Sequence, residues 1–512
     1  MRARLRARHV RGGSPPVARR RMAGGATMSA LMLLFPVVGA ALAGILRSRL
    51  GVAAGFATTI ATFVTALFLP SSGAVSFTWL PALGLTVTLD PSGARSVLLL
   101  AASLTMIPVV LAASRLDRTQ RDTFVALLLV MQASLNGVFL ATDLVLTYVF
   151  WEATLLPSLF LLGLFGGEHR RGAITKYLIY AFMGSFLMLA SILALLPLSG
   201  AASYAFTDLL PAARELDPVV QTWLFAGFAA AFAVKLPLFP LHSWLIDFHR
   251  QNHPSGLADV GGTLYKVGGF GFFAWAIPLL PDGAAAFQPL LLTLAAVTAF
   301  WGGLAATQQK DLKSMLAYMS LSHMGIVGVG VFSLTSFGLT GAMFLLAAQM
   351  ISTGGLFLLS GMLHARTGSF AFDRYGGLAK SAPALAGLFL FVLFAAIGVP
   401  GLSNFPGEFM SLLGAFEAAP LLGAFAALGS VVAAGVYGVN TFQRLFQGTP
   451  GERRADVAAL DVAILAPVIA GILWLGLAPA AQLARIDAST QTAVTAVSAP
   501  ELPGVVAEGG ER

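Results

Sequence analysis

The sequence contains no cysteine in its 512 residues. Disulfide bonds and cysteine-ligated metal or iron–sulfur centres are therefore excluded within this chain. Charge is also scarce, because Asp, Glu, Lys and Arg make up 11% of the residues, against about 25% in soluble domains. Hydrophobic residues instead make up 57% of the chain, and its mean hydropathy is +0.82. This composition predicts an all-α, polytopic membrane protein surrounded by the lipid bilayer.

The motifs of soluble cofactor chemistry are also missing from the sequence. It has no Gly-rich phosphate loop after a strand, no Walker motif, and no pair of histidines placed for haem ligation inside a membrane. We therefore expect neither a cofactor nor a metal in this chain.

The net charge of +8 arises in the N-terminal segment. Residues 1–27 hold eight arginines and no acidic residue, so the rest of the chain is neutral and nucleic-acid binding is not indicated. Three interpretations of this segment stay open: a targeting segment, a lipid-surface anchor, or an over-extended start with initiation at Met22 or Met28. We favour the last, and expect residues 1–27 to be disordered or absent from the mature protein.

Fourteen apolar windows are long enough to cross the roughly 30 Å of hydrocarbon in a bilayer. The segment from Ser71 to Pro91 alternates in polarity and contains Gly and Pro, so it predicts an exterior hairpin instead of a span. The expected spans are 29–46, 51–69, 96–114, 123–140, 144–165, 174–197, 221–246, 257–280, 287–306, 314–333, 337–363, 382–415, 420–441 and 460–479.

Loop charges predict the orientation of these spans. Alternate loops carry seventeen Lys and Arg residues, whereas the opposite set carries only Arg95, Arg214, Arg485 and Arg512. By the positive-inside rule the first set is cytoplasmic, which places both chain termini outside. Eight further arginines on the outer side would contradict that rule, which is why we favour a later start.

The seventh span carries a charge and a break. In FAAAFAVKLPLFPLHSWL, Lys235 is followed by Pro237, Pro240 and His242. A lysine at this depth costs about 3 kcal/mol on insertion scales and is retained where it faces a protein interior or a hydrated path. The two prolines remove backbone donors and interrupt the helix. Interrupted helices that carry a charge are typical of ion pathways.

A second break occurs five spans later, in AAIGVPGLSNFPGEFM, where Pro400 and Pro406 precede Glu408. An offset of five spans puts equivalent helices in opposite directions, which predicts two inverted five-helix repeats with broken helices 7 and 12. The expected organisation is a basic extension (1–27), helices 1–3 (28–122), a first repeat of helices 4–8 (123–280), a second repeat of helices 9–13 (287–441), and helix 14 with a C-terminal tail (442–512).

Five ionisable residues are expected at depth in the bilayer. They are Glu152, Lys235, Lys266, His323 and Glu408. This series of acids, lysines and a histidine is what a proton relay needs. Burial beside charged neighbours can make such groups gain and lose a proton near neutral pH. We expect Glu152 and Lys235 to form an ion pair whose opening lets Lys235 lose its proton, Lys266 to pass charge sideways, and Glu408 to be the terminal acceptor.

Structural explanations for these residues remain open. Glu152 could simply neutralise a lysine, and His323 could be a hydrogen-bonded packing residue beside two serines. His242 could gate water entry or only cap the break. Asp259 is interpreted as a helix-start acid. Other ionisable residues near the cytoplasmic loops are expected on a solvated face: Glu168, His169, Asp247, His249, His253 and His364.

Five motifs carry a resemblance to a known family. FWEATLLPSLFLLGLFG, AFAVKLPLFPLHSWLIDFH, GGTLYKVGGFGF, QKDLKSMLAYMSLSHMGIV and GVPGLSNFPGEFM closely resemble the antiporter-like membrane subunits of respiratory complex I and the related Mrp-type cation/proton antiporters. The resemblance covers roughly residues 143–446. Glutamate in a PGEF setting, at Glu408, points to the M-type chain (chain 4 in mitochondrial naming). The lack of a long amphipathic arm after Leu477 also argues against the L-type chain.

The resemblance implies a role for each of the buried ionisable residues. Glu152 matches the pairing acid of span 5, Lys235 the lysine of span 7, Lys266 the central lysine, His323 the connecting histidine and Glu408 the terminal acid. One position departs from the family pattern: Gln349 stands where a histidine is often found. Since glutamine cannot titrate, we expect water between Lys266 and Glu408.

The resulting hypothesis is a proton-translocating subunit of a bacterial NADH:quinone oxidoreductase in the inner (plasma) membrane. The resemblance implies that NADH, FMN, iron–sulfur clusters and quinone belong to partner subunits, and that the L-type and N-type subunits are neighbours. The alternatives are an Mrp-type cation/proton antiporter subunit, a membrane subunit of an energy-converting hydrogenase or bicarbonate-uptake complex, and a scaffold whose charges only pack.

Overall fold

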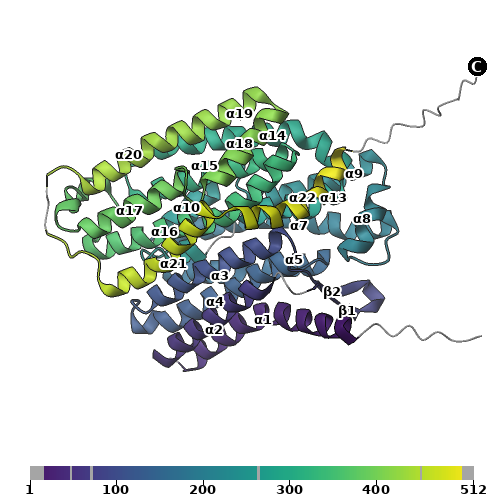
Figure 1. The fold of residues 1–512 in the computed structure, drawn as a ribbon, viewed down its shortest axis with the longest axis horizontal. Coiled ribbons are helices and arrows are strands. Elements are labelled where there is room, and N and C mark those ends of the chain that lie inside the picture. Colours follow the sequence, from purple (N-terminus) through teal and green to yellow (C-terminus); the bar gives the residue numbers. More distant parts are fainter. Residues whose placement is uncertain (1–15, 47–48, 70–72, 262–265, 450–452, 499–512) are drawn as a thin grey trace, which may run out of the picture.

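A computed structural model describes residues 16–46, 49–69, 73–261, 266–449 and 453–498. Within these residues twelve helices are long and apolar enough to cross a membrane. Two shorter apolar helices, Lys266–Leu279 and Pro383–Ala396, lie where the eighth and twelfth spans were expected. The predicted all-α membrane architecture with about fourteen spans is confirmed. The spans run side by side along the long axis of the molecule (Figure 1).

The N-terminal part consists of three long helices and one hairpin. Its elements are α1 (Pro16–Leu46), α2 (Arg49–Phe68), β1 (Val75–Leu80), β2 (Leu85–Leu89) and α3 (Ala94–Ala113). The strands are antiparallel, with Val75 opposite Leu89, which confirms the predicted hairpin. Its turn ends at Gly84, whose φ of 65° is readily adopted only without a Cβ. Figure 1 shows this hairpin at the same end of the bundle as α8.

The first repeat contains the first broken span. Its elements are α4 (Arg118–Leu140), α5 (Leu144–Ala153), α6 (Leu155–Phe165), α7 (Arg170–Ser199), α8 (Phe206–Arg214), α9 (Pro218–Lys235), α10 (Ser243–Gln251), α11 (Leu257–Gly261), α12 (Lys266–Gly271), the π-helical turn η4 (Phe272–Ala276) and α13 (Ile277–Leu279). The predicted interruption of span 7 therefore lies between α9 and α10.

The second repeat contains the second broken span. Its elements are α14 (Pro281–Thr307), α15 (Leu312–Phe332), α16 (Ser336–Thr367), the 3₁₀ turns η5 (Phe372–Arg374) and η6 (Leu378–Lys380), α17 (Pro383–Ala396), α18 (Phe405–Ala418), α19 (Pro420–Ala427), the π-helical turn η7 (Leu428–Val432) and α20 (Ala433–Phe446). The interruption of span 12 lies between α17 and α18, as predicted.

Local details recur between the two halves with the expected five-span offset. Asp143 caps the N-terminus of α5 and forms an isolated bridge with Ala205, and Asp311 caps α15 and bridges Ala371 in the same way. A π-helical turn interrupts span 8 at η4 and span 13 at η7. Because equivalent helices five spans apart run in opposite directions, these matches support the inverted repeat inferred from the sequence.

Several boundaries differ from those predicted. Helix α1 begins at Pro16, so residues 16–27, expected to be disordered or absent, are helical in this structure, whereas residues 1–15 lie outside the described residues. The limits at 122 and 287 fall inside α4 and α14, and α20 continues past residue 441. After α21 (Ala459–Leu477), a further helix, α22 (Ala480–Ser498), packs against α16 and α13. Hydropathy missed α22 because its composition is mixed.

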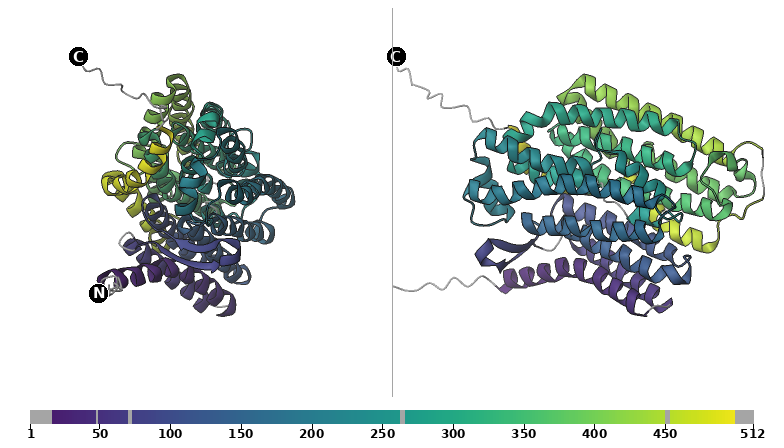
Figure 2. Two further views of the ribbon diagram at one scale, coloured as in Figure 1. Left: turned by 90° about the vertical axis from the view of Figure 1, so that its right-hand side faces the viewer. Right: turned by 180° about the vertical axis from the view of Figure 1, so that it is seen from behind.

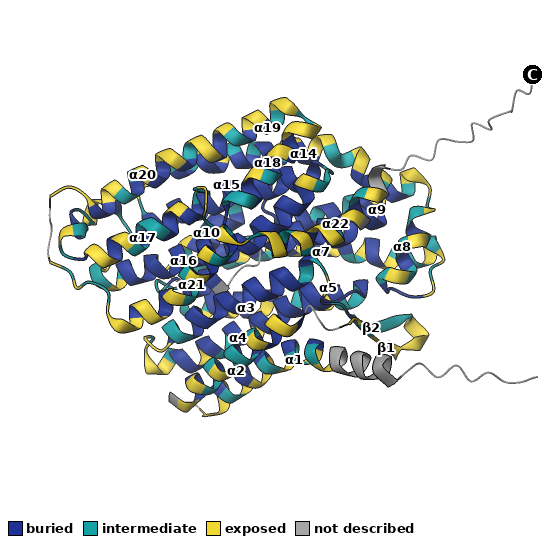
Figure 3. Cartoon of the chain, viewed as in Figure 1, coloured by how far each residue is buried: buried dark blue, intermediate teal, exposed yellow. Residues whose placement is uncertain are grey.

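Burial is greatest around α15 and α16, which are enclosed by the other helices (Figure 3). The 18-residue apolar windows of these helices are 94% and 100% buried. Figures 1 and 2 show α1 and α2 at one margin of the bundle and α19 and α20 at the opposite margin. His323 on α15 and Gln349 on α16 therefore lie in the protein interior and not at the lipid surface.

Candidate functional site

The first break leaves Lys235 at the end of a helix inside the protein. Helix α9 ends at Lys235, and α10 does not begin until Ser243, with Pro237 and Pro240 between them. Trp244 bridges the gap by donating its indole N–H to the carbonyl of Val234 at 3.1 Å. This bond satisfies a carbonyl that the break would otherwise leave without a partner. Lys235 is only 2% exposed.

The ammonium of Lys235 is held by an aromatic residue of α7. Lys235 Nζ donates to the hydroxyl of Tyr177 at 3.0 Å and lies 5.3 Å from the centre of that ring. It also lies 5.7 Å from the Trp151 ring. The expected ion pair with Glu152 is not formed, since these two residues are outside the 4.0 Å ion-pair distance in this structure. Glu152 follows Trp151 on α5, and its Oε1 is buried without a hydrogen-bond partner among the described residues.

His242 lies within the first break, next to α10. It occupies the N-cap position of α10 without forming a side-chain cap bond. Its ring stacks on Phe239, with 5.4 Å between the ring centroids, and its Nδ1 is buried without a protein partner in the described part of the chain. The capping interpretation is therefore not supported, and a role in hydration of the break stays a prediction.

Lys266 begins α12 and packs close to the end of α9. It is 2% exposed. A Cβ placed on Gly268, two residues later, would lie 2.4 Å from the backbone nitrogen of Leu236 and 2.8 Å from the carbonyl carbon of Lys235. Glycine is thus required for this approach of α12 to the break. The geometry brings the helix termini that carry the two lysines into direct contact.

The second break makes room for the carboxylate of Glu408. Gly398 has a φ of 75°, and a Cβ at this position would lie against Oε2 of Glu408. Asn404 spans the gap by donating to the carbonyl of Ala396 at 3.1 Å, and it accepts a bond from Ser352 of α16 at 2.9 Å. Pro400 lies in the gap, and Pro406 is in the first turn of α18. Asn404 was missed from the sequence because its partners are on other elements.

His323 and Glu408 lie together in the second half of the protein. His323 Nε2 is 3.7 Å from Glu408 Oε1, and both residues are buried. Gln349 on α16 is fully buried, and neither polar atom of its amide has a hydrogen-bond partner within the described ranges. Buried polar groups are normally paired with protein or water, and the expected hydrated step between Lys266 and Glu408 stays a prediction.

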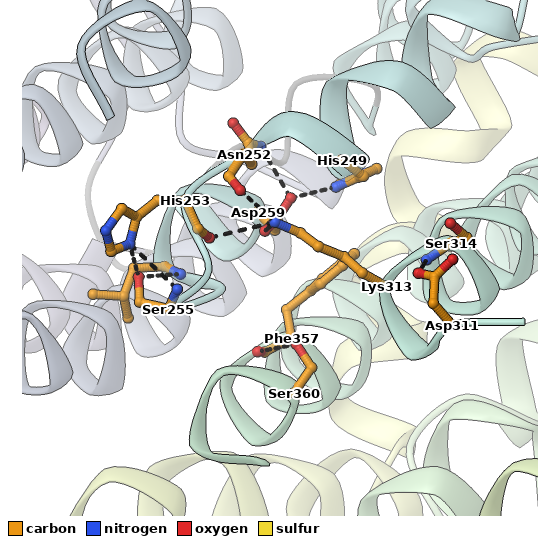
Figure 4. Close-up of polar contacts among 11 residues, drawn as sticks. His249, Asn252, His253, Ser255, Asp259, Asp311, Lys313, Ser314, Phe357 and Ser360 are labelled. Atoms are coloured by element: carbon orange, nitrogen blue, oxygen red, sulfur yellow. Dashed lines mark hydrogen bonds and ion pairs between the residues drawn. The ribbon is translucent and has the colours of Figure 1, made fainter. Parts of the chain in front are cut away.

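A further buried cluster lies where α10, α11 and α15 meet (Figure 4). The carboxylate of Asp259 contacts His249 Nδ1 at 2.7 Å and accepts a bond from Asn252 at 2.9 Å. Lys313 Nζ is 3.3 Å from the second oxygen of Asp259 and donates to the carbonyls of Asn252 and His253.

The prediction that His249 lies on a solvated face was wrong. Lys313, counted among the cytoplasmic loop charges, is also buried, with 2% of its surface exposed, and Asp259 has the same exposure. The interpretation of Asp259 as a simple helix-start acid was incomplete. The sequence carries only a weak signal for this cluster. Asp259 and Lys313 each lie in the first turn of a helix that follows a loop.

Metal ligation has no candidate site in the part of the chain that the structure describes. No three His, Asp or Glu side chains lie close enough together there to hold an ion. The buried acids, lysines and histidines of this arrangement are groups that can bind and transfer protons.

Comparison with known proteins identifies the relatives of this chain. The family model for the NADH:quinone oxidoreductase/Mrp antiporter membrane domain matches residues 141–434. The NADH-quinone oxidoreductase subunit 13 of Thermus thermophilus is 44% identical over 458 residues, covering 88% of this chain and 95% of that protein. Subunit M of the Rhodobacter capsulatus enzyme is 33% identical, covering 82% of this chain and 86% of the relative.

The fold agrees with that of a solved relative. A chain in the structure of respiratory complex I from Thermus thermophilus with bound NADH superimposes with a TM-score of 0.87 at 42% identity. The match covers 92% of this chain and all of that one. The chain therefore belongs to the NADH:quinone oxidoreductase/Mrp antiporter family of multi-pass membrane subunits.

Proposed function

We propose that this chain is the proton-translocating M-type membrane subunit of a bacterial NADH:quinone oxidoreductase. Its similarity to subunits 13 and M of that enzyme supports the assignment. NADH, FMN, iron–sulfur clusters and quinone would be bound by partner subunits, and the L-type and N-type subunits would be its neighbours in the membrane. This chain itself would contribute protonatable side chains and no redox centre.

One observation supports proton transfer more than any other. Two buried ionisable residues lie where helices break: Lys235 at the end of α9, and Glu408 beside the gap before α18. A buried charge in a bilayer protein is costly and is retained where ions pass. Broken helices leave carbonyls and amides that water can solvate, which suits a path for protons.

The proposed sequence begins at the first break. A change in the partner subunits alters the distance between Glu152 and Lys235, and with it the hold of Lys235 on its proton. The proton passes to Lys266, whose helix contacts the end of α9, and then through water beside Gln349. The pair of His323 and Glu408 receives it before release from the second half of the protein.

The test is to replace Lys235 with alanine, and in a second variant Glu152 with alanine, in the assembled complex. Proton pumping and NADH oxidation are measured together in membrane vesicles. We expect a loss of most of the pumped protons per NADH from this subunit, because each change removes one charge of the controlling pair. The exposed Lys380→Ala variant is a matched control that should pump normally. Unchanged stoichiometry in both charge variants would refute this role.

An Mrp-type cation/proton antiporter remains the second candidate, because the matching family model covers those proteins as well. Sodium-dependent pH changes in vesicles separate the two functions. An antiporter acidifies or alkalinises vesicles when a sodium gradient is imposed without NADH. A subunit of the oxidoreductase does so only when NADH is oxidised.

A further inference from the structure

The position of the Lys235 ammonium is the starting point. In this structure it bonds to the phenol of Tyr177 instead of pairing with Glu152, although Trp151, the residue next to Glu152, touches the same ammonium. Tyr177 is fully buried, and Lys235 nearly so. Glu152 keeps one buried carboxylate oxygen without a hydrogen-bond partner in the described part of the chain. The lysine therefore has two nearby acceptors, one anionic and one neutral.

Tyr177 is held in place by the helix that follows the break. Its ring packs on Trp244, with 4.8 Å between the ring centroids, and on Phe248 at 5.2 Å. The same Trp244 bonds to the carbonyl of Val234, directly before Lys235. On either side of Tyr177, α7 also contacts α10 through the half-exposed Lys176–Asp247 pair at 2.7 Å and through the Tyr180 and Ser243 hydroxyls at 3.1 Å.

We propose that Tyr177 is a positioning residue that provides the second resting place of the Lys235 ammonium, so that the lysine alternates between Glu152 and Tyr177. This inference rests on the proposed function and adds a residue to it. A phenol oxygen accepts the N–H bond but carries no charge, so it orients the ammonium without the attraction of a carboxylate. The arrangement in this structure is then the open state of the pair.

The geometry gives α10 control over this second position. Trp244 and Phe248 both belong to α10, and the end of the same helix is attached to the buried cluster through His249 and Asp259. A displacement of α10 would therefore move the Tyr177 ring and the Val234 carbonyl together. The ammonium would lose its neutral acceptor and return to Glu152.

The experiment replaces Tyr177 with phenylalanine in the complex that contains this chain. The ring and its packing are kept, and only the hydroxyl is lost. We expect the pumped protons per NADH to fall about tenfold or more for this subunit, as for loss of one charge-assisted hydrogen bond. A high-resolution density map of the variant should show the Lys235 ammonium within ion-pair distance of Glu152. The alkaline limb of the pumping pH profile should move to higher pH, because an ammonium beside a carboxylate releases its proton less readily than one beside a neutral phenol.

Tyr180→Phe is the matched control, because it removes a hydroxyl of the same helix that bonds to α10 but does not touch Lys235. It should pump normally with an unchanged pH profile. All values are normalised to the amount of assembled complex, and Lys235→Ala is measured in parallel. One outcome overturns the inference but leaves the proposed function standing: Tyr177→Phe pumps normally with the lysine still beside the ring, while Lys235→Ala loses pumping. Tyr177 would then have a packing role alone. Normal pumping by Lys235→Ala would overturn both.

Discussion

At the scale of single residues, Asp259 is the centre of a buried cluster of charged and polar side chains. Its carboxylate contacts His249, Asn252 and Lys313, and Lys313 also bonds to two carbonyls of the connection between α10 and α11. Removing one partner from such a set leaves a buried charge without compensation, which is far costlier than losing an exposed pair. The cluster therefore fastens α10, α11 and α15 to one another.

Asp259→Asn should lower the free energy of unfolding by about 3 kcal/mol, because Lys313 would remain buried without its counter-charge. The measurement is the amount of assembled complex and its midpoint temperature of denaturation. Asp247→Asn is the control, since Asp247 forms a half-exposed pair with Lys176 and its loss should change stability by less than about 1 kcal/mol. An equal loss of stability in the two variants would show that the buried cluster stabilises the fold no more than the half-exposed pair does.

At the scale of elements, each of the two breaks is stabilised by a side-chain hydrogen bond and by a glycine, contributed by different residues. Across the first, Trp244 bonds to Val234, and Gly268 lets α12 approach the backbone. Across the second, Asn404 bonds to Ala396, and Gly398 leaves space for the carboxylate of Glu408. In both cases a side chain supplies the hydrogen bond that the backbone of a continuous helix would have formed. The carbonyl before each gap is therefore paired although the helix is interrupted.

Gly398→Ala should displace the Glu408 carboxylate from His323 and lower proton pumping at least severalfold. Gly401→Ala provides a close control: Gly401 also has a positive φ, of 88°, but nothing lies within 4 Å of the position its Cβ would take. Both variants should lose about 1 kcal/mol of stability through the backbone strain. Only Gly398→Ala should lose pumping, measured as protons translocated per NADH. A loss of equal size in both would assign the effect to strain alone.

At the scale of the whole molecule, one carboxylate joins the beginning, middle and end of the chain. Asp461 of α21 pairs with Arg115, which follows α3, at 2.5 Å, and with Arg366 of α16 at 2.8 Å. Arg366 also bonds to the carbonyls of Ala455 and Asp456. Helix α16, whose 18-residue apolar window is fully buried, is thereby attached to the helices that flank the two repeats.

Asp461→Asn should destabilise the protein by about 2 kcal/mol, less than Asp259→Asn, because Arg115 is partly exposed and regains water. The expected observation is a lower denaturation midpoint with normal pumping in the complex that does assemble. Asp373→Asn, an exposed acid, serves as the control and should match the parent protein. Reduced pumping per assembled complex would instead indicate that this junction takes part in proton transfer.

Hydropathy and breaking residues alone predicted the membrane class, the order of the spans, the hairpin and both interrupted helices, because these depend on local composition and on the missing donors of proline. The same local reasoning selected the deep ionisable residues. It could not predict that Lys235 meets Tyr177, 58 positions earlier, or that Arg115 meets Asp461, 346 positions later. Nor could it separate the buried Lys313 from the exposed Lys310 three positions away. The burial and partners of a charge at a helix end are decided by segments that only tertiary packing brings there.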